Sequence, residues 1–268
     1  MTSQTTATGA SLWGETATPG EAWQHQIRER KAASGDSREY SQDIANAEVR
    51  RIDIATARAV IEEYEWLGCM PAIVLFAFGI YFGPDLGGVV AYSPEYGENL
   101  GVWDKYGYTG KIITLSRGAC TWWAHPHSAS KLIRGSMKLL PPRYEVVTAT
   151  VDAAAGEVGT IYQACNFDYV QMDTNARNGA IINGKTYTAR SIRREFGSGS
   201  LKMLRERFGA AAVVPLKEKP KGRYFAFRGG KVARKHNRAM IKPLIKPYPH
   251  RDVSAEPAVA YEGLPMAA

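Results

Sequence analysis

The chain has 268 residues, a formal net charge of +8, and ordinary apolar and charged fractions of 45% and 22%. This length suits one domain with tails. No apolar run approaches the roughly 20 residues of a membrane-spanning helix, and we predict no secretory signal and no membrane partner. The three cysteines match no zinc-site spacing, so we expect reduced thiols in a cytoplasmic protein.

The positive charge is concentrated in the C-terminal third. Residues 190–251 contain 18 Lys and Arg but only three Glu, a net charge of +15, so the rest of the chain carries −7 (8 − 15). Aromatic residues lie between these cations, which is typical of binding to phosphates and bases. The alternative is a solvated basic face. We expect a nucleic acid as a partner, contacted by Arg193, Arg194, Arg223 and Lys235.

The predicted elements begin after a mostly disordered tail over residues 1–45, in which a short helix near 23–30 is expected. Helices are predicted over 53–67, 127–140, near 160–165, over 191–196 and over 200–208. Strands are predicted over 72–82 (with a bulge at Gly79), 87–92, 111–120, 144–152, directly after the short helix, and over 222–227. A hairpin is predicted over 180–189, with Asn183 and Gly184 at its turn.

This order of elements predicts an α/β fold. Its central sheet is mixed, antiparallel at first and with one parallel crossover in the middle, and helices flank it. We expect a core over residues 46–190, a basic C-terminal part over 191–251 that completes the domain and binds DNA, and a flexible tail over 252–268.

The predicted crossover has features of a phosphate site. The strand ending "LSRGAC" leads through "TWWAHPH" to a helix that begins "SASK". The N–H groups of its first turn, with Ser128, Ser130 and Lys131, are able to hold a pyrophosphate. Ordinary helix capping is the alternative. His125 and His127 are two residues apart, but no third ligand lies close in sequence, so a structural role is favoured over metal binding.

Two side chains are candidates for acid–base chemistry. Asp152 ends the predicted strand "YEVVTATVD", where open α/β sheets keep their ligands. Tyr162 opens a short helix ten residues later. If both overhang one cleft, Asp152 is suited to accept a proton from an amine and Tyr162 to protonate a leaving thiolate. The alternative is that Asp152 caps a loop and Tyr162 packs in the core.

The order of elements resembles the GNAT fold of N-acetyltransferases, with "ACNFDYV" similar to the turn after its short helix. More narrowly, six stretches resemble the Mom family of phage DNA-modification proteins: "YEWLGCMP", "LSRGAC", "HSASKLI", "YEVVTATVD…GTIYQACNFDYV", "GRYFAF" and "KPYP". The similarity runs from about residue 48 to 251. Members of that family convert adenine in DNA to an N6-methylcarbamoyl derivative, which protects phage DNA from restriction in the bacterial host.

This resemblance implies roles for individual residues. It implies double-stranded DNA as the partner and acetyl-CoA or a related acyl-CoA as donor, and it allows for iron. Asp152 and Tyr162 would be the reactive pair, and Glu65 and Trp66 the adenine side, where the family often has a His-Tyr pair instead. The resemblance places Arg117 and Ser130 beside the acyl-CoA. Together with the predicted crossover, the residues expected beside the acyl-CoA are Arg117, Gly118, Ala119, Cys120, His127, Ser128, Ser130 and Lys131.

Two other functions remain open on the sequence alone. One is an N-acyltransferase of the GNAT type that acts on another amine, such as a modified base, a protein or a small molecule. The other is a catalytically inactive DNA-binding protein. The basic third argues against a small-molecule acceptor, and the Asp152 and Tyr162 pair argues against an inactive protein. The oligomeric state is open, with a homodimer as one alternative.

Overall fold

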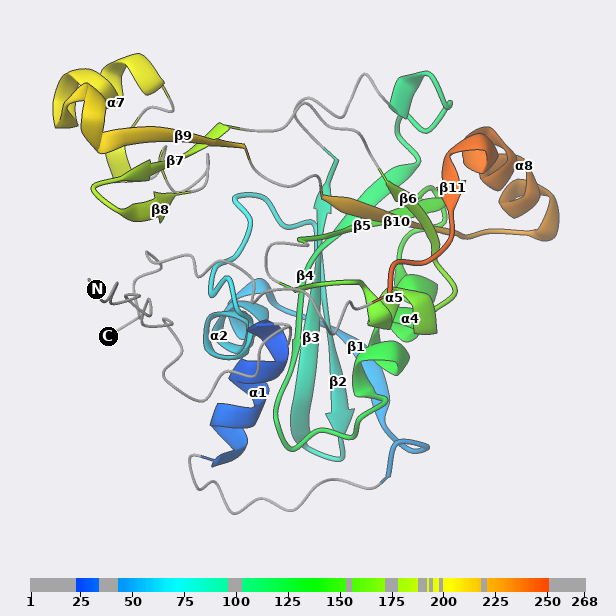
Figure 1. The fold of residues 1–268 in the computed structure, drawn as a ribbon. Coiled ribbons are helices and arrows are strands. Elements are labelled where there is room, and N and C mark those ends of the chain that lie inside the picture. The colour runs from blue at the N-terminus through cyan, green and yellow to red at the C-terminus, as the bar shows by residue number, and fades with distance from the viewer. Residues whose placement is uncertain are drawn as a thin grey trace.

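The computed structural model describes most of the chain. It covers residues 23–33, 43–95, 103–152, 156–171, 178–187, 192, 195–197, 200–217 and 221–250 (Figure 1). Within these residues, no helix combines the length and the apolar character needed to cross a membrane.

Within the described residues, the central sheet has eight strands in the order β1-β2-β3-β4-β5-β10-β6-β11. Only the β4–β5 pair is parallel, and every other neighbouring pair is antiparallel. The predicted mixed α/β fold is therefore confirmed. The strands are β1 (Glu48–Ile52), β2 (Phe76–Phe82), β3 (Asp85–Pro94), β4 (Ile112–Cys120), β5 (Val146–Val151), β6 (Asp168–Gln171), β10 (Gly222–Phe227) and β11 (Ile245–Lys246).

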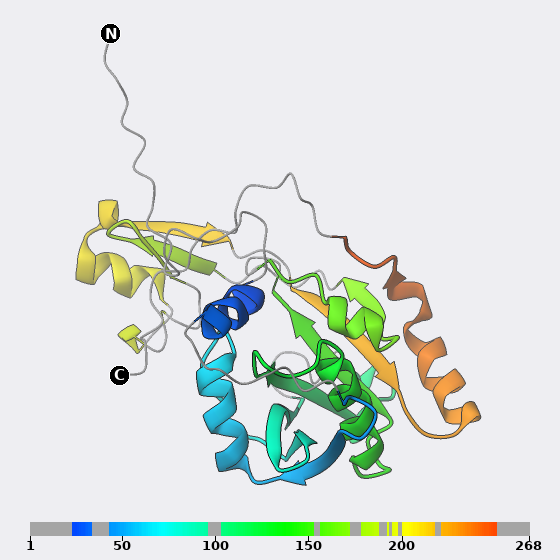
Figure 2. The same cartoon turned by 90° about the horizontal axis from the view of Figure 1, so that it is seen from below.

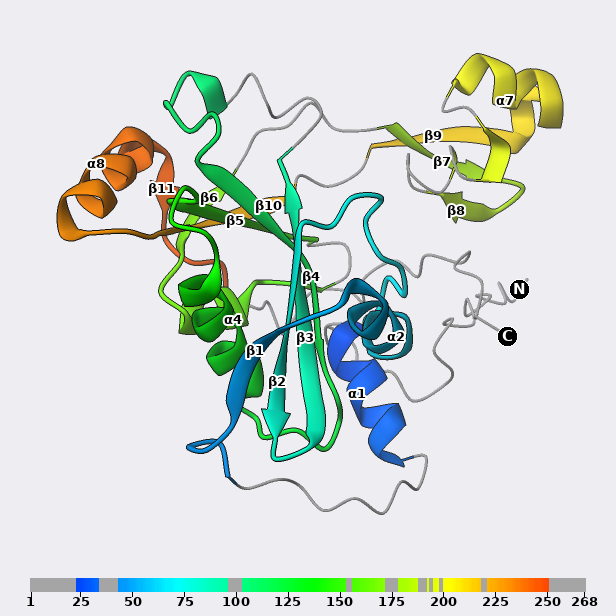
Figure 3. The same cartoon turned by 180° about the vertical axis from the view of Figure 1, so that it is seen from behind.

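Helices cover both faces of this sheet (Figures 1 and 3). On one face, α2 (Ile54–Tyr64) packs on β2, β3 and β4, with α1 (Trp23–Ala33) beside it. On the other face lie α4 (Ser128–Leu139) and α5 (Thr160–Ala164). Because β2 and β3 are buried between these two layers, their sequences are almost continuously apolar.

Most predicted elements are present. The strands predicted over 72–82, 87–92, 111–120, 144–152 and 222–227 correspond to β2, β3, β4, β5 and β10. The helix near residue 23 is α1. The β2–β3 irregularity lies between Ile80 and Tyr81 and not at Gly79, because Gly79 itself pairs regularly with Val89. β1, β9, α8 and β11 were not predicted. The remaining parts of both predicted tails lie outside the described residues, except for 43–45.

The parallel pair separates after a short contact. β4 and β5 pair only from Ile112 opposite Val146 to Leu115 opposite Ala149, although β4 continues to Cys120. Between β3 and β4 the register shifts at the same level, between Ala91 and Tyr92. Such an irregularity bends a strand locally, so the C-terminal halves of β4 and β5 diverge.

A smaller unit, residues 178–217, is inserted between β6 and β10 and is called the inserted unit below (Figure 2). It contains β7 (Asn178–Ile182), β8 (Lys185–Tyr187), α7 (Leu201–Phe208), the short η3 (Ala210–Ala212) and β9 (Val213–Lys217). The β7–β8 hairpin turns at Asn183 and Gly184 with φ of 51° and 80°, as predicted. The unit has its own apolar cluster, which includes Ile192 and Leu204.

The chain returns from the inserted unit into the middle of the central sheet. Gly222, the first residue of β10, lies opposite both Val151 of β5 and Gln171 of β6. After β10 come α8 (Lys231–Ile241), the short η4 (Lys242–Leu244) and β11. The basic C-terminal third therefore supplies a central strand of the sheet as well as surface helices.

Tyr224 of β10 supports the start of α5. Its ring is fully buried, and its hydroxyl donates to the carbonyl oxygen of Val158 at 2.6 Å. Gly159, the N-cap of α5, has φ of 71°, and a Cβ there would lie 2.4–2.8 Å from the Tyr224 ring and hydroxyl. Only glycine satisfies both the left-handed backbone and this close approach.

We expect Gly159→Ala to destabilise the fold by about 2–4 kcal/mol, because left-handed strain adds to overpacking against Tyr224. Gly110→Ala is the matched control, since Gly110 has φ of 74° and no atom within 4 Å of an added Cβ. It should cost about 1–2 kcal/mol from strain alone. Urea unfolding of both variants measures the difference, and equal losses would contradict the packing role of Gly159.

Candidate active site

Asp152 lies where β5 ends. Because β5 and β10 are antiparallel with Val151 opposite Gly222, the residue after β5 meets the residue before β10. Oδ2 of Asp152 lies 2.8 Å from Nζ of Lys221, and 16% of the Asp152 side chain is exposed. Lys221 was not singled out from the sequence, because it is one of many cations in the basic third.

Tyr162 lies on α5 with its ring half-buried. The ring packs against Phe167 and Tyr224, with centroids 5.5 and 5.3 Å away. Burial raises the pKa of its hydroxyl far above the usual range, and the nearby carboxyl groups of Glu157 and Glu65 raise it further. The hydroxyl therefore stays protonated at neutral pH and acts as a donor. Within the described part of the chain, nothing hydrogen-bonds to it.

Glu157 is a site residue that the sequence did not reveal. Its Oε1 accepts from the indole Nε1 of Trp66 at 2.8 Å, and its Oε2 accepts from the backbone N of Asp152 at 2.8 Å. Burial raises the pKa of Glu157, while the donors on Asp152 and Trp66 act in the opposite direction. Glu157 thus joins the predicted adenine side to the predicted reactive pair.

Arg117 also reaches the predicted adenine side. Its Nε donates to the carbonyl oxygen of Cys69 at 2.7 Å and lies 3.5 Å from Oε2 of Glu65. Both side chains of this ion pair are largely buried, with 12% of Arg117 and 9% of Glu65 exposed. Arg117 was assigned to the acyl-CoA side, but its guanidinium extends from β4 to the segment after α2.

The side chains at the end of β4 lie on opposite faces of the central sheet. Ala119 is buried with Ala57 and Ile61 in the cluster beneath α2. Cys120 packs against the core on the opposite face, and burial raises the pKa of its thiol to about 12. Gly118 is half-buried, and a Cβ there would lie 3.1 Å from Val90.

Several polar side chains in the first turn of α4 already have hydrogen-bond partners within the protein. Ser130 Oγ donates to the carbonyl oxygen of His127 at 2.9 Å. Lys131 Nζ donates to the carbonyl oxygens of Ile44 and Ala45 at 2.5 and 2.8 Å. Ser128 is fully buried, and its Oγ finds no hydrogen-bond partner among the described residues.

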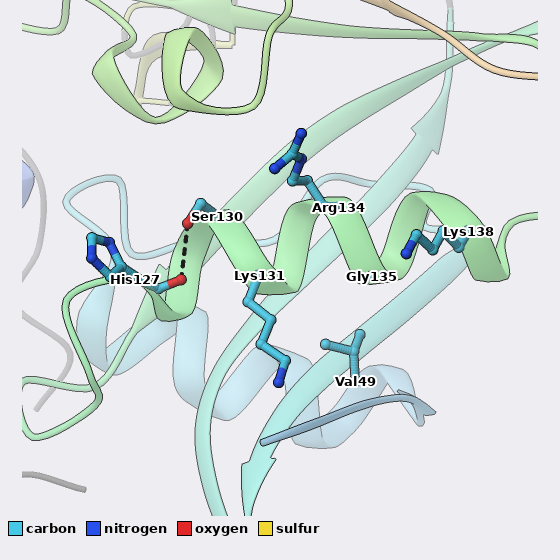
Figure 4. Close-up of a pocket in the computed structure, with 7 residues that line it drawn as sticks. All are labelled: Val49, His127, Ser130, Lys131, Arg134, Gly135 and Lys138. Carbon is cyan, nitrogen blue, oxygen red and sulfur yellow. Dashed lines mark hydrogen bonds between the residues drawn. The ribbon is translucent and has the colours of Figure 1, made fainter. Parts of the chain in front are cut away.

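A pocket of about 430 Å³ runs along α4 from this first turn to Lys138 (Figure 4). Its lining contains four basic or imidazole side chains and no acid. Figure 4 shows Lys131 and Arg134 projecting to different sides of the helix. The pocket residues are Val49, His127, Ser130, Lys131, Arg134, Gly135 and Lys138. The spacing of Lys131, Arg134 and Lys138 along one helix was the available sequence signal for this surface.

The predicted DNA-contacting residues are placed differently from one another. Arg223 is buried in β10, where Nη1 forms an ion pair with Glu95 Oε1 at 2.8 Å and the guanidinium lies over the Trp103 ring. It therefore does not belong to an exposed surface. Lys235 is exposed on α8. Arg193 and Arg194 lie outside the described residues.

The described residues contain no group of three or more His, Cys, Asp or Glu side chains that could hold a metal ion. The rings of His125 and His127 lie 5.3 Å apart, and the backbone N of His127 donates to Nδ1 of His125. This contact gives the histidine pair a local structural role in the loop before α4.

Comparisons with known proteins identify the family to which the chain belongs. No curated protein matches the chain. Among solved structures, an acetyltransferase from Bacillus subtilis in complex with CoA is similar at 10% identity and a TM-score of 0.33, over 68% of this chain and 98% of that chain. A model of the Mom protein family matches residues 46–250. The chain therefore belongs to the Mom protein family, the phage DNA-modification proteins that its motifs resemble.

Proposed function

We propose that the protein is a transferase that modifies N6 of adenine in double-stranded DNA, with acetyl-CoA or a related acyl-CoA as the carbon donor. Membership of the Mom family supports this proposal. The main structural support is that residues from separate segments meet at one corner: Trp66 after α2, Asp152 after β5, and Glu157 and Tyr162 at α5.

The adenine side of the proposed site lies at Glu65 and Trp66. N6 of adenine is paired inside a duplex, so the base must leave the stack before it reacts. An indole ring is a suitable stacking surface for such a base. The carboxylate of Glu65, held by Arg117, is an acceptor suited to an exocyclic amine.

The acyl-CoA side of the proposed site lies between the separated strands and α4. Where β4 and β5 diverge, backbone groups are released from the sheet ladder and can bind an extended ligand. The N-terminus of α4 and the basic pocket beside it favour phosphate groups. Arg134 and Lys138 add exposed positive charge, whereas the Lys131 ammonium is already bound to two backbone carbonyl oxygens.

Asp152 and Tyr162 have complementary roles in the proposed transfer. Asp152 accepts a proton from the attacking amine, and Lys221 compensates its negative charge. The Tyr162 hydroxyl donates to the sulfur that departs. Because a thiol has a pKa of about 8.5 and the pKa of Tyr162 is raised, this hydroxyl stabilises the thiolate by a hydrogen bond more readily than by complete proton transfer.

The product we propose is N6-methylcarbamoyl adenine. A methylcarbamoyl group has a nitrogen between its carbonyl and methyl carbons, which the acetyl group of acetyl-CoA lacks. Forming it breaks the carbon–carbon bond of the acetyl group and is a two-electron oxidation. A second reactant must therefore supply nitrogen at the oxidation level of hydroxylamine, or ammonia together with an oxidant. N6 is a donor that proteins read in the major groove. A substituent there changes the edge that a restriction enzyme contacts, which accounts physically for protection.

DNA docking is proposed for the basic C-terminal part, chiefly α8. Lys231, Arg234 and Lys235 are exposed at helical spacing on this helix, and α8 contains no acid. Arg238 is bound to Asp168 by two hydrogen bonds of 2.6 and 2.7 Å, which anchors the helix to β6. Because the same third contains β10 and β11, removing it would also remove strands of the central sheet.

Substitutions on α8 should therefore test DNA binding without disturbing the sheet. We expect Arg234→Gln with Lys235→Gln to weaken duplex binding and to reduce the slope of log K against log salt by about 2, since each lost phosphate contact removes about 0.9. Lys31→Gln with Arg58→Gln, exposed on α1 and α2, is the matched control. An unchanged slope in the α8 variant would contradict this docking surface.

A negative charge at the α4 N-terminus should oppose acyl-CoA binding. We expect Ser130→Asp to weaken CoA binding at least tenfold in calorimetry, because it places a carboxylate where a pyrophosphate is proposed. An acid in the first turn favours the helix itself, so the Tm should not fall. Ala55→Asp, in the first turn of α2, is the control, and equal CoA binding by both variants would rule out this site.

The reactive pair is tested by two isosteric substitutions. We expect Asp152→Asn and Tyr162→Phe each to lower adenine modification at least about 100-fold, the lower end of acid–base contributions. Nucleoside mass spectrometry of DNA from bacteria that express each variant measures this. Tyr169→Phe, whose ring also packs on Tyr224, is the control. Normal modification by either variant would refute its role, and a collapsed Tm would instead indicate a structural one.

A further inference from the structure

Both oxygens of the Glu157 carboxylate are bound by donors that belong to the candidate active site. Oε1 binds the Trp66 indole, and Oε2 binds the backbone N of Asp152, each at 2.8 Å. The backbone N of Glu157 also donates to the carbonyl oxygen of Asp152 at 3.2 Å. One half-buried side chain therefore joins the segment after β5 to the segment after α2, across 91 residues of sequence.

This arrangement specifically requires a carboxylate. Two N–H donors converge on one side chain, and a carboxylate accepts on both oxygens, whereas an amide offers one acceptor and one donor group. Burial raises the pKa of Glu157, so a charge there is costly unless hydrogen bonds offset it. Closing the loop after β5 needs only the bonds to Asp152, and the bond to Trp66 therefore calls for a further explanation.

We propose that Glu157 is a positioning residue, which holds the Trp66 indole and the Asp152 carboxylate in a fixed relation so that a base stacked on the indole presents its amine to Asp152. This inference rests on the proposed function. Binding the Nε1 edge sets the plane of the indole ring, and binding the backbone N of Asp152 sets where its side chain begins. Glu157 touches no reacting atom in this role, and it acts through its two neighbours.

Glu157→Gln should break one of the two bonds while keeping the shape of the side chain. We expect modification to fall about 10- to 100-fold, the loss typical when a group that orients a reactive residue is removed. CoA and DNA affinities should stay within twofold of the parent protein. Glu62→Gln, an exposed carboxylate on α2 paired with Arg58, is the matched control and should retain full activity.

A double variant separates positioning from general structural support. If Glu157 acts through Asp152, adding Glu157→Gln to Asp152→Asn should lower modification little further, because groups that act as a unit are not additive. Independent losses that multiply would overturn the inference. If the unsubstituted protein modifies adenine and the Glu157→Gln variant does so equally well, the inference is also overturned.

The bond to Trp66 is measured without any activity. In ¹⁵N-labelled protein, the Trp66 indole resonance, assigned by its loss in Trp66→Phe, should move in Glu157→Gln and remain in place in Glu62→Gln. An unmoved resonance overturns the inference even if adenine is modified. If the resonance moves but the unsubstituted protein does not modify DNA, the proposed function is refuted. The contact between Glu157 and Trp66 is still supported in that case.

Discussion

The position of β10 between β5 and β6 is the constraint on which the rest of the structure depends. This strand completes the sheet from the basic C-terminal third, and its Tyr224 lies beneath the first turn of α5. The same strand begins directly after Lys221, the cation paired with Asp152. Without β10, the edge of β5 that faces away from β4 would be open, and β5 would pair only along its short parallel contact with β4.

The candidate site has a charge opposite to that of the basic surfaces. Three carboxyl groups gather there, on Glu65, Asp152 and Glu157, against the cations of Arg117 and Lys221. Like charges repel over short distances in a partly buried site. In the proposed reaction, this corner excludes the phosphates of DNA and admits an uncharged base, while the phosphates remain on exposed cations such as those of α8.

Sequence patterns predicted the elements that depend on local physics. Apolar runs marked β2 and β3, the Asn183-Gly184 turn marked the small hairpin, and the crossover followed from the order of elements. β1 was missed because its sequence, "EVRRI", is polar and lies at an edge of the sheet. α8 was missed because its apolar stripe is thin, with Val232 82% exposed.

Asp152 and Tyr162 were named from the sequence with the help of a family resemblance, and their reactive roles stay a prediction. Glu157 could not be found in this way, because its role depends on an indole 91 residues away. Arg223 was also misleading as a sequence signal. In a basic stretch it resembles a surface cation, yet the fold buries it against Glu95, 128 residues away, and no local pattern records such a partner.

The late place of β10 in the chain has a consequence for synthesis on the ribosome. β5 ends at Val151 and β10 ends at Phe227, which is 76 residues later (227 − 151). At about 5–20 residues per second, the nascent chain exposes one edge of β5 for roughly 4–15 seconds before its partner emerges. Unpaired strand edges are sites of aggregation, so the inserted unit, with its separate core, prolongs the interval in which this edge of β5 is open to wrong pairing.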